Sequence, residues 1–133
     1  MHTSTGILRY DCNAGKYVEP WWALLQCDQQ IADYYTWQLN RYGIEVISNS
    51  KGLWGSHISV MKGETPLHPE PWRKYEGFEV EFHYTHLIRH ENGEHAWVDV
   101  YSEQLSSIRI ELGFVAKPWY HLTIGRLVRP YNY

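Results

Sequence analysis

The sequence predicts an α+β domain of two pseudo-symmetric lobes, each a small antiparallel β-sheet with one outer helix, and an active cleft between the lobes. Two observations support this fold class. A pattern of histidine, apolar residue, hydroxyl residue and apolar residue occurs twice, at residues 57–60 and 121–124, about half a chain apart. The expected elements follow the same order around both copies: a strand, a helix and then the strand that carries the pattern. The chain of 133 residues is long enough for one domain, with halves at roughly 1–66 and 67–133.

The first half of the chain contains three expected strands and one expected helix. We expect strands over 6–10, 44–47 and, carrying the first motif, 56–61, with a helix over 20–42. Pro20 suits the first turn of a helix, and Gly43 suits the position just after its last turn. Apolar residues at spacings of three and four, including Leu24, Cys27 and Ile31, indicate the buried side of that helix.

The second half begins with a loop, which is followed by a hairpin and a helix. Residues 67–76 are too rich in proline to form a regular element throughout, and we expect them to cover the cleft. Asn92-Gly93 is a strong signal for a hairpin turn. Ser102 suits the N-terminal cap of a second helix, which Gly113 ends. We expect strands over 78–82, continuing to residue 89, over 95–101 and, carrying the second motif, over 119–127.

Each motif places polar and apolar side chains on opposite faces of its strand. Residues two apart share a face, so His57 lies beside Ser59 and His121 lies beside Thr123. Two such strands set opposite each other bring two imidazoles and two hydroxyls to one point. That set suits acid–base chemistry on a phosphate ester, in which one histidine takes a proton, the other gives one, and the hydroxyls hold phosphoryl oxygens. These four residues are the candidate catalytic residues, and the assignment of base and acid stays open.

With these two motifs the sequence resembles the two-histidine (2H) phosphoesterases, which carry one His-x-Thr/Ser-x motif in each pseudo-symmetric half. By its size and aromatic content it also resembles the phage anti-CBASS nucleases, which cut cyclic oligonucleotide immune signals. The resemblance implies a metal-independent phosphodiesterase without a cofactor, acting in the cytoplasm of the host cell if a phage encodes it. Proteins of this kind open 2′,3′-cyclic phosphates, trim RNA ends or cut cyclic oligonucleotides, and the sequence leaves these substrates open.

Four further residues are candidates for binding the substrate. Trp119 shares the face of the second motif and can stack on a base, although a packing role at the rim stays open. Gly125 lies on the same face and would let a phosphate or base approach the backbone. Tyr10 and Trp72 are weaker candidates for base contacts, because each also suits packing. Three cations flank the motifs and could hold phosphates, although a solvated surface charge is the favoured interpretation of each: Lys62, Arg73 and Arg126.

The composition narrows the classes of partner. The net charge of −3 argues against duplex DNA, which requires a basic face, but it allows a small nucleotide held by a few local cations. Seven tryptophans and eleven tyrosines supply candidate base-stacking groups. The two cysteines favour free thiols in the cytoplasm, and no apolar stretch is long enough to span a membrane. The oligomeric state is not predicted.

Two alternatives to the enzyme remain. A protein with this fold could sequester a nucleotide without cutting it, although intact histidine–hydroxyl pairs in both halves favour catalysis. The predicted hairpin also carries several histidines, including His83, His86, His90 and His95, which could in principle bind a metal. On a strand His86 and His90 share one face whereas His83 points to the other, so surface histidines are the better interpretation and no metal ligand is predicted.

Overall fold

The computed structural model describes residues 1–13, 21–48, 54–91 and 94–128 of the chain. The first half contains β1 (His2–Tyr10), β2 (Trp22–Cys27), α1 (Gln29–Arg41), β3 (Val46–Ser48) and β4 (His57–Lys62). The second half contains β5 (Glu79–Glu91), β6 (His95–Tyr101), α2 (Glu103–Glu111) and β7 (Tyr120–Leu127). The chain is therefore mostly β-structure with two short helices in its described part.

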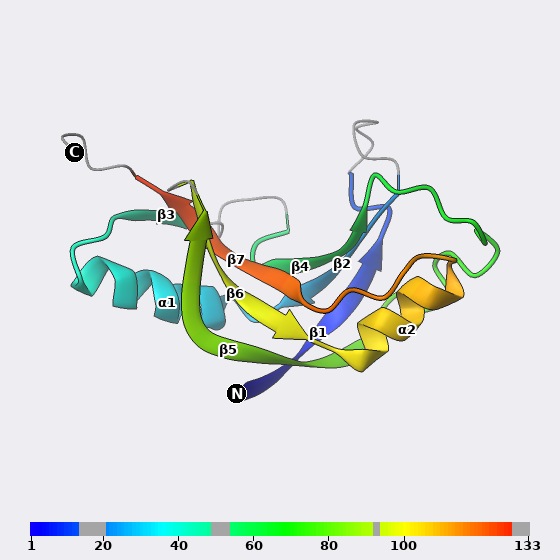
Figure 1. Ribbon diagram of the computed structural model, residues 1–133, viewed down its shortest axis with the longest axis horizontal. Helices are drawn as coiled ribbons and strands as arrows, with labels where there is room; N and C mark the ends of the chain where they lie inside the picture. Colours follow the sequence, from blue (N-terminus) through cyan, green and yellow to red (C-terminus); the bar gives the residue numbers. More distant parts are fainter. Residues whose placement is uncertain (14–20, 49–53, 92–93, 129–133) are drawn as a thin grey trace.

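Six strands close into one antiparallel β-barrel in the order β4-β2-β1-β5-β6-β7, with β7 paired to β4 and β3 added at the edge of β7 (Figure 1). The first half supplies the adjacent strands β4, β2 and β1, and the second half supplies β5, β6 and β7. The prediction of two separate α+β lobes with a cleft between them is therefore wrong. Each three-stranded sheet would have two open edges. β1 pairs with β5 along one pair of edges, and β7 pairs with β4 at Ile58 and Leu122 and with β3 beyond that point.

The predicted helix over 20–42 is also wrong in its first part. Residues Trp22–Cys27 form strand β2 between β1 and β4, and the helix α1 begins only after Asp28. The Asp28 carboxylate accepts a hydrogen bond from the backbone N–H of Gln30 at 2.9 Å, which caps the helix. The short apolar stretch before Asp28 suits a strand buried on both faces as well as a helix, so its periodicity could not separate the two. Pro20 lies outside the described residues.

The remaining predicted elements agree more closely with the structure. β5, β6 and β7 cover the three strands expected in the second half, and residues 67–76 form turns and irregular backbone. Ser102 caps α2 by accepting a hydrogen bond from the Leu105 N–H, and Gly113 follows the helix with φ +90°. β1 is longer than expected because its first residues pair with β5. Asn92 and Gly93 lie outside the described residues.

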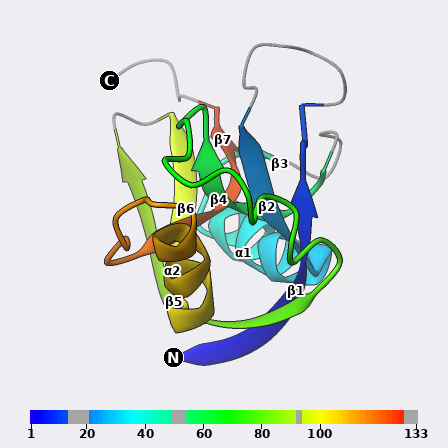
Figure 2. The ribbon, with the colours of Figure 1, turned by 90° about the vertical axis from the view of Figure 1, so that its right-hand side faces the viewer.

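The two helices pack at opposite ends of the molecule (Figures 1 and 2). α1 contacts β7 and β3 through its buried face of Ala32, Tyr35 and Leu39, whereas α2 contacts β5 and β4. The strands contribute most of the core, which includes the aliphatic residues of both motifs. The motif strands β4 and β7 are therefore held by packing on the core and by their neighbours in the barrel. None of the helices in the described ranges is long and apolar enough to cross a membrane.

Candidate active site

The two motifs lie on neighbouring strands. β4 and β7 pair antiparallel with Ile58 opposite Leu122, and both of these side chains are fully buried in the core. The histidine and hydroxyl positions flank this pair and point to the other face of each strand. Because the strands run in opposite directions, His57 faces the position of Thr123, and Ser59 faces that of His121. Each histidine is thus set beside the hydroxyl of the other motif.

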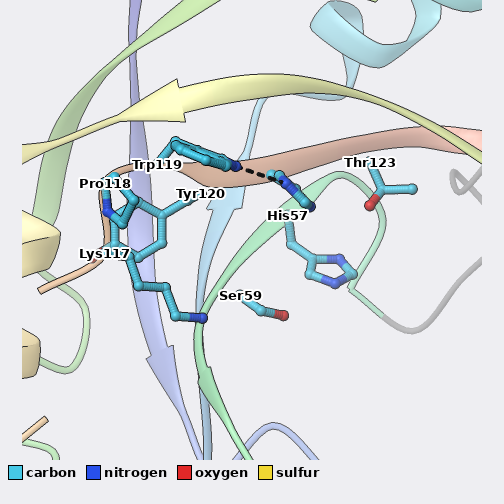
Figure 3. A pocket seen from close by; sticks show the side chains of 8 residues that line it. His57, Ser59, Lys117, Pro118, Trp119, Tyr120 and Thr123 are labelled. Carbon is cyan, nitrogen blue, oxygen red and sulfur yellow. Dashed lines mark hydrogen bonds between the residues drawn. The ribbon is translucent and has the colours of Figure 1, made fainter. Parts of the chain in front are cut away.

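A pocket of about 470 Å³ opens over this pair of strands (Figure 3). Its volume falls in the range of small-ligand sites. The residues that line it come from β4, from β7 and from the segment that enters β7: His57, Ser59, Lys117, Pro118, Trp119, Tyr120, His121 and Thr123. The structure therefore brings together the four residues proposed for catalysis and one of those proposed for substrate binding. No carboxylate is among these lining residues.

His57 is held in one tautomer by the backbone. Its Nδ1 lies 2.9 Å from the carbonyl oxygen of Gly55, and because a carbonyl can only accept, Nδ1 carries the proton. Nε2 of the neutral ring is then an acceptor. Burial lowers the pKa of His57, the hydrogen bond to Gly55 opposes that shift, and the charge of Lys62 adds to it. The net effect is a lowered pKa, which favours the neutral imidazole that a general base requires.

Trp22 of β2 supports the first motif. Its indole N–H donates to Oγ of Ser59 at 3.1 Å, which leaves the Ser59 hydroxyl proton available for a ligand. The Trp22 ring meets the His57 ring edge to face at 5.9 Å, and the Lys62 ammonium lies 4.4 Å from the centre of the indole. Trp22 is not among the residues predicted for the site, because it lies in the stretch expected to be helical. Only its placement on β2, beside β4, brings it to the motif.

His121 contacts two tryptophans. The indole N–H of Trp119 donates to Nε2 of His121 at 3.2 Å, so in this arrangement His121 is neutral and carries its proton on Nδ1. The ring of Trp97, on the neighbouring strand β6, stacks on the His121 ring with 4.7 Å between centres and 28° between planes. Trp97 in turn donates to Asp99 at 3.1 Å, and Arg89 binds the same carboxylate at 2.8 Å. These contacts fix the Trp97 ring against the His121 imidazole.

The segment that carries Lys117 and Trp119 is fixed to α2. The Arg109 side chain is 2% exposed and donates to the carbonyl oxygens of Val115 and Val60, each at 2.8 Å. Glu64 pairs with the same guanidinium through both of its oxygens, at 3.0 and 3.3 Å. Since Val60 belongs to β4 and Val115 precedes Lys117, one buried cation connects the first motif strand with the segment that leads to the second.

Three of the predicted substrate-binding residues do not line this pocket. Tyr10 is 5% exposed in the core, where its ring meets that of Trp72 edge to face at 4.9 Å. Trp72 also donates to the Asp11 carboxylate at 3.0 Å, so it anchors its loop. Gly125 is required by packing: a Cβ there would collide with the carbonyl oxygen of Ile47 on β3. Gly125 therefore allows β3 to approach β7 closely, and this approach does not involve a ligand.

The histidines of the hairpin are not gathered around a common point. Nδ1 of His83 lies 2.8 Å from the Thr3 hydroxyl of β1, and its Nε2 lies 3.8 Å from Glu81. Within the described ranges no three histidine, cysteine or acidic side chains are placed so that they could hold a metal ion together. Cys12 and Cys27 are both free thiols.

Comparison of the chain with family models, with curated proteins and with solved structures found no match. The case for an activity therefore rests on the pocket itself and on the two motifs within it.

Proposed function

We propose that this protein is a metal-independent phosphodiesterase of the 2H type that acts on a nucleotide. The observation that carries the proposal is the convergence of His57, Ser59, His121 and Thr123 in one pocket, each histidine beside the other motif's hydroxyl. This set can move two protons and bind two phosphoryl oxygens, which is what cleavage of a ribose phosphodiester requires. A protein that only sequestered a nucleotide would not need two imidazoles that can take and give a proton.

In the proposed reaction the ribose 2′-hydroxyl is the nucleophile. Nε2 of His57 takes the 2′ proton as the 2′ oxygen bonds to phosphorus, and the bond from phosphorus to the 5′ oxygen breaks. Protonated His121 gives its proton to the departing 5′ oxygen, so that a 2′,3′-cyclic phosphate and a free 5′-hydroxyl result. The assignment of His57 as base follows from its burial and tautomer, which favour the neutral ring. Ser59 and Thr123 donate to the phosphoryl oxygens.

We further propose that the substrate is a cyclic oligonucleotide immune signal, cut on behalf of a phage in the cytoplasm of its host. The support is the resemblance of the two motifs to 2H enzymes, the aromatic residues at the pocket and the free thiols of Cys12 and Cys27. RNA ends and 2′,3′-cyclic nucleotides are the alternative substrates of the same chemistry. A sequestering protein of the same fold would bind such ligands and leave them intact.

The decisive experiment is incubation of the purified chain with cyclic dinucleotides, oligoadenylates and 2′,3′-cyclic nucleotides in the presence of EDTA. Chromatography is needed to follow a cyclic substrate, because ring opening by the internal 2′-hydroxyl leaves the mass unchanged. We expect one substrate class to be opened, and its analogue with 2′-deoxyribose at the scissile position to resist. Binding without cleavage would support the sequestering protein, and equal cleavage of the deoxy analogue would replace internal attack by attack of water.

A further inference from the structure

Lys117 is a lining residue of the pocket that neither motif contains. It lies in the segment between α2 and β7, two residues before Trp119. Figure 3 shows its side chain extended across the pocket, with the amine pointing toward Ser59 of β4. The ammonium group therefore approaches the first motif from the segment that leads into the second motif strand.

The charge of Lys117 is not matched by an ion pair with any residue that the structure describes. The two other lysines in that part of the chain are engaged: Lys62 stacks on Trp22, and Lys74 binds Glu111 at 2.7 Å. Burial lowers the pKa of Lys117, the nearby Arg109 charge lowers it further, and Glu64 opposes the shift. A partly desolvated ammonium beside two imidazoles and no lining carboxylate makes the pocket suited to an anion.

The backbone of Lys117 is fixed in relation to β4. Ser106 of α2 donates to the Lys117 carbonyl at 3.5 Å, and Arg109 holds the Val115 carbonyl two residues earlier. Because Arg109 also binds the Val60 carbonyl next to Ser59, the base of the Lys117 side chain keeps a set distance from the first motif. Such an arrangement prepares a binding group before the ligand arrives.

We propose that Lys117 binds a nonbridging oxygen of the substrate phosphate and makes the pocket selective for phosphorylated ligands. The inference rests on the proposed function for its choice of phosphate as the anion. It adds a cation that the two motifs do not supply: the hydroxyls orient the phosphate as neutral donors, and Lys117 provides a full positive charge. The attacked phosphate gains negative charge in the transition state, so the same contact should also favour turnover.

The test is calorimetric titration of the whole chain with adenosine 3′-monophosphate, for the wild type and for Lys117→Met. Lys74→Met is the matched control, because it removes the same charge from a lysine that does not line the pocket. We expect Lys117→Met to weaken binding by about tenfold or more, as expected for loss of a charge-assisted contact, and Lys74→Met to bind as the wild type does. The wild-type affinity should fall with added salt more steeply than that of Lys117→Met.

The proposal is overturned if Lys117→Met binds the nucleotide as tightly as the wild type, or if the wild type does not bind it at millimolar concentration. Turnover of the substrate panel is judged separately. Lys117-dependent binding without any turnover would keep this inference and reject the phosphodiesterase. If Lys117→Met turned over the substrate and bound the nucleotide as the wild type does, the phosphodiesterase would be supported and the proposed role of Lys117 rejected.

Discussion

The indole N–H of Trp119 donates a hydrogen bond to Nε2 of His121 at 3.2 Å, so the lone pair on this nitrogen is already used as an acceptor. A tryptophan N–H can only donate, and a protonated imidazole has no acceptor. The contact is therefore compatible with neutral His121 alone and must break when His121 carries the proton that it is proposed to give. Trp119 is 43% exposed, which leaves it free to turn toward a base.

Two replacements of Trp119 distinguish the contribution of its aromatic ring to binding from that of its N–H. Trp119→Phe keeps an aromatic face and should bind a nucleotide with an affinity close to that of the wild type. Trp119→Ala should lose about 1–3 kcal/mol of binding free energy, the usual contribution of one base stacked on an aromatic side chain. Calorimetry with a dinucleotide measures both. Equal affinity for all three proteins would return Trp119 to a packing role at the rim.

Removal of either motif histidine should abolish most turnover. His57→Ala and His121→Ala each remove one proton carrier, for which a loss of roughly a hundred- to ten-thousand-fold is expected. Ser59→Ala and Thr123→Ala each remove one donor to the phosphate. Each should lower turnover by at most about a thousand-fold. Circular dichroism checks that the variants are folded. His83→Ala, which alters a histidine bonded to Thr3 outside the pocket, is the control and should retain full activity.

The pH profile of kcat/KM should depend on Lys62. Burial, assisted by the Lys62 charge, lowers the pKa of His57, so the acid limb of the profile should lie below the ordinary histidine range. Lys62→Met removes a positive charge that disfavours protonation, and the limb should therefore move to higher pH. NMR titration of the His57 ring should show the same direction. Lys74→Met is the control. An equal shift of the acid limb in that variant would show that the shift does not depend on a charge near the pocket.

Acid should weaken the contact between Glu64 and Arg109. The hydrogen bonds and charge of Arg109 lower the pKa of Glu64, so the folded state holds this carboxylate ionised to lower pH than the unfolded chain does. The pair thus stabilises the fold above the unfolded pKa, and that stability is lost as the pH falls through the folded pKa. Glu64→Gln should cost about 1 kcal/mol near neutrality: Arg109 stays buried with a weaker partner, but the Glu64 side chain is 43% exposed and solvent screens its charge.

Chemical denaturation at pH 7 and pH 4 measures this effect. The difference between wild type and Glu64→Gln should shrink at the lower pH. Glu111→Gln, which alters an exposed pair with Lys74, should change stability less at both values. A Glu64→Gln protein as stable as the wild type at pH 7 would show that the carbonyl oxygens alone satisfy Arg109.

Gly125→Ala should reduce stability and leave ligand binding unchanged. The added Cβ would lie against the carbonyl oxygen of Ile47 and 2.7 Å from Cγ1 of Val46, so β3 would have to shift. Overpacking of this kind costs about 1–3 kcal/mol. Thermal unfolding and nucleotide affinity should be measured on the same sample. Weaker binding at unchanged stability would instead support the role in ligand approach that the sequence suggested.

The placement of the motif residues could be predicted because strand alternation is a local rule. His57 and Ser59 share a face wherever a strand passes through them, and the same holds for His121 and Thr123. The register that joins the motifs, Ile58 opposite Leu122, is a long-range pairing that no local pattern encodes. The sequence therefore predicted five residues of the pocket, the four motif residues and Trp119, but placed them in a cleft between lobes and not on one barrel wall.

Other features depended on information that a single sequence lacks. The stretch from Trp22 to Cys27 is almost entirely apolar, so its pattern of polar and apolar residues cannot distinguish a strand from a helix. Trp22 was therefore expected on a helix and was not predicted as a site residue. Lys117 was passed over because only the fold shows that its segment enters the pocket. Tyr10 and Trp72 were proposed as base contacts because aromatic side chains suit stacking and packing equally well, and their mutual contact reveals packing.

The single ladder pair between Ile58 and Leu122 joins strands from opposite halves of the chain. Folding must bring these distant residues together before the pocket exists, and contacts of such large sequence separation form late and slowly. A partly folded chain with β1, β2 and β4 in place would have one imidazole and one hydroxyl of the proposed set. During refolding, activity should therefore appear with the slowest kinetic phase, after most of the secondary structure has formed.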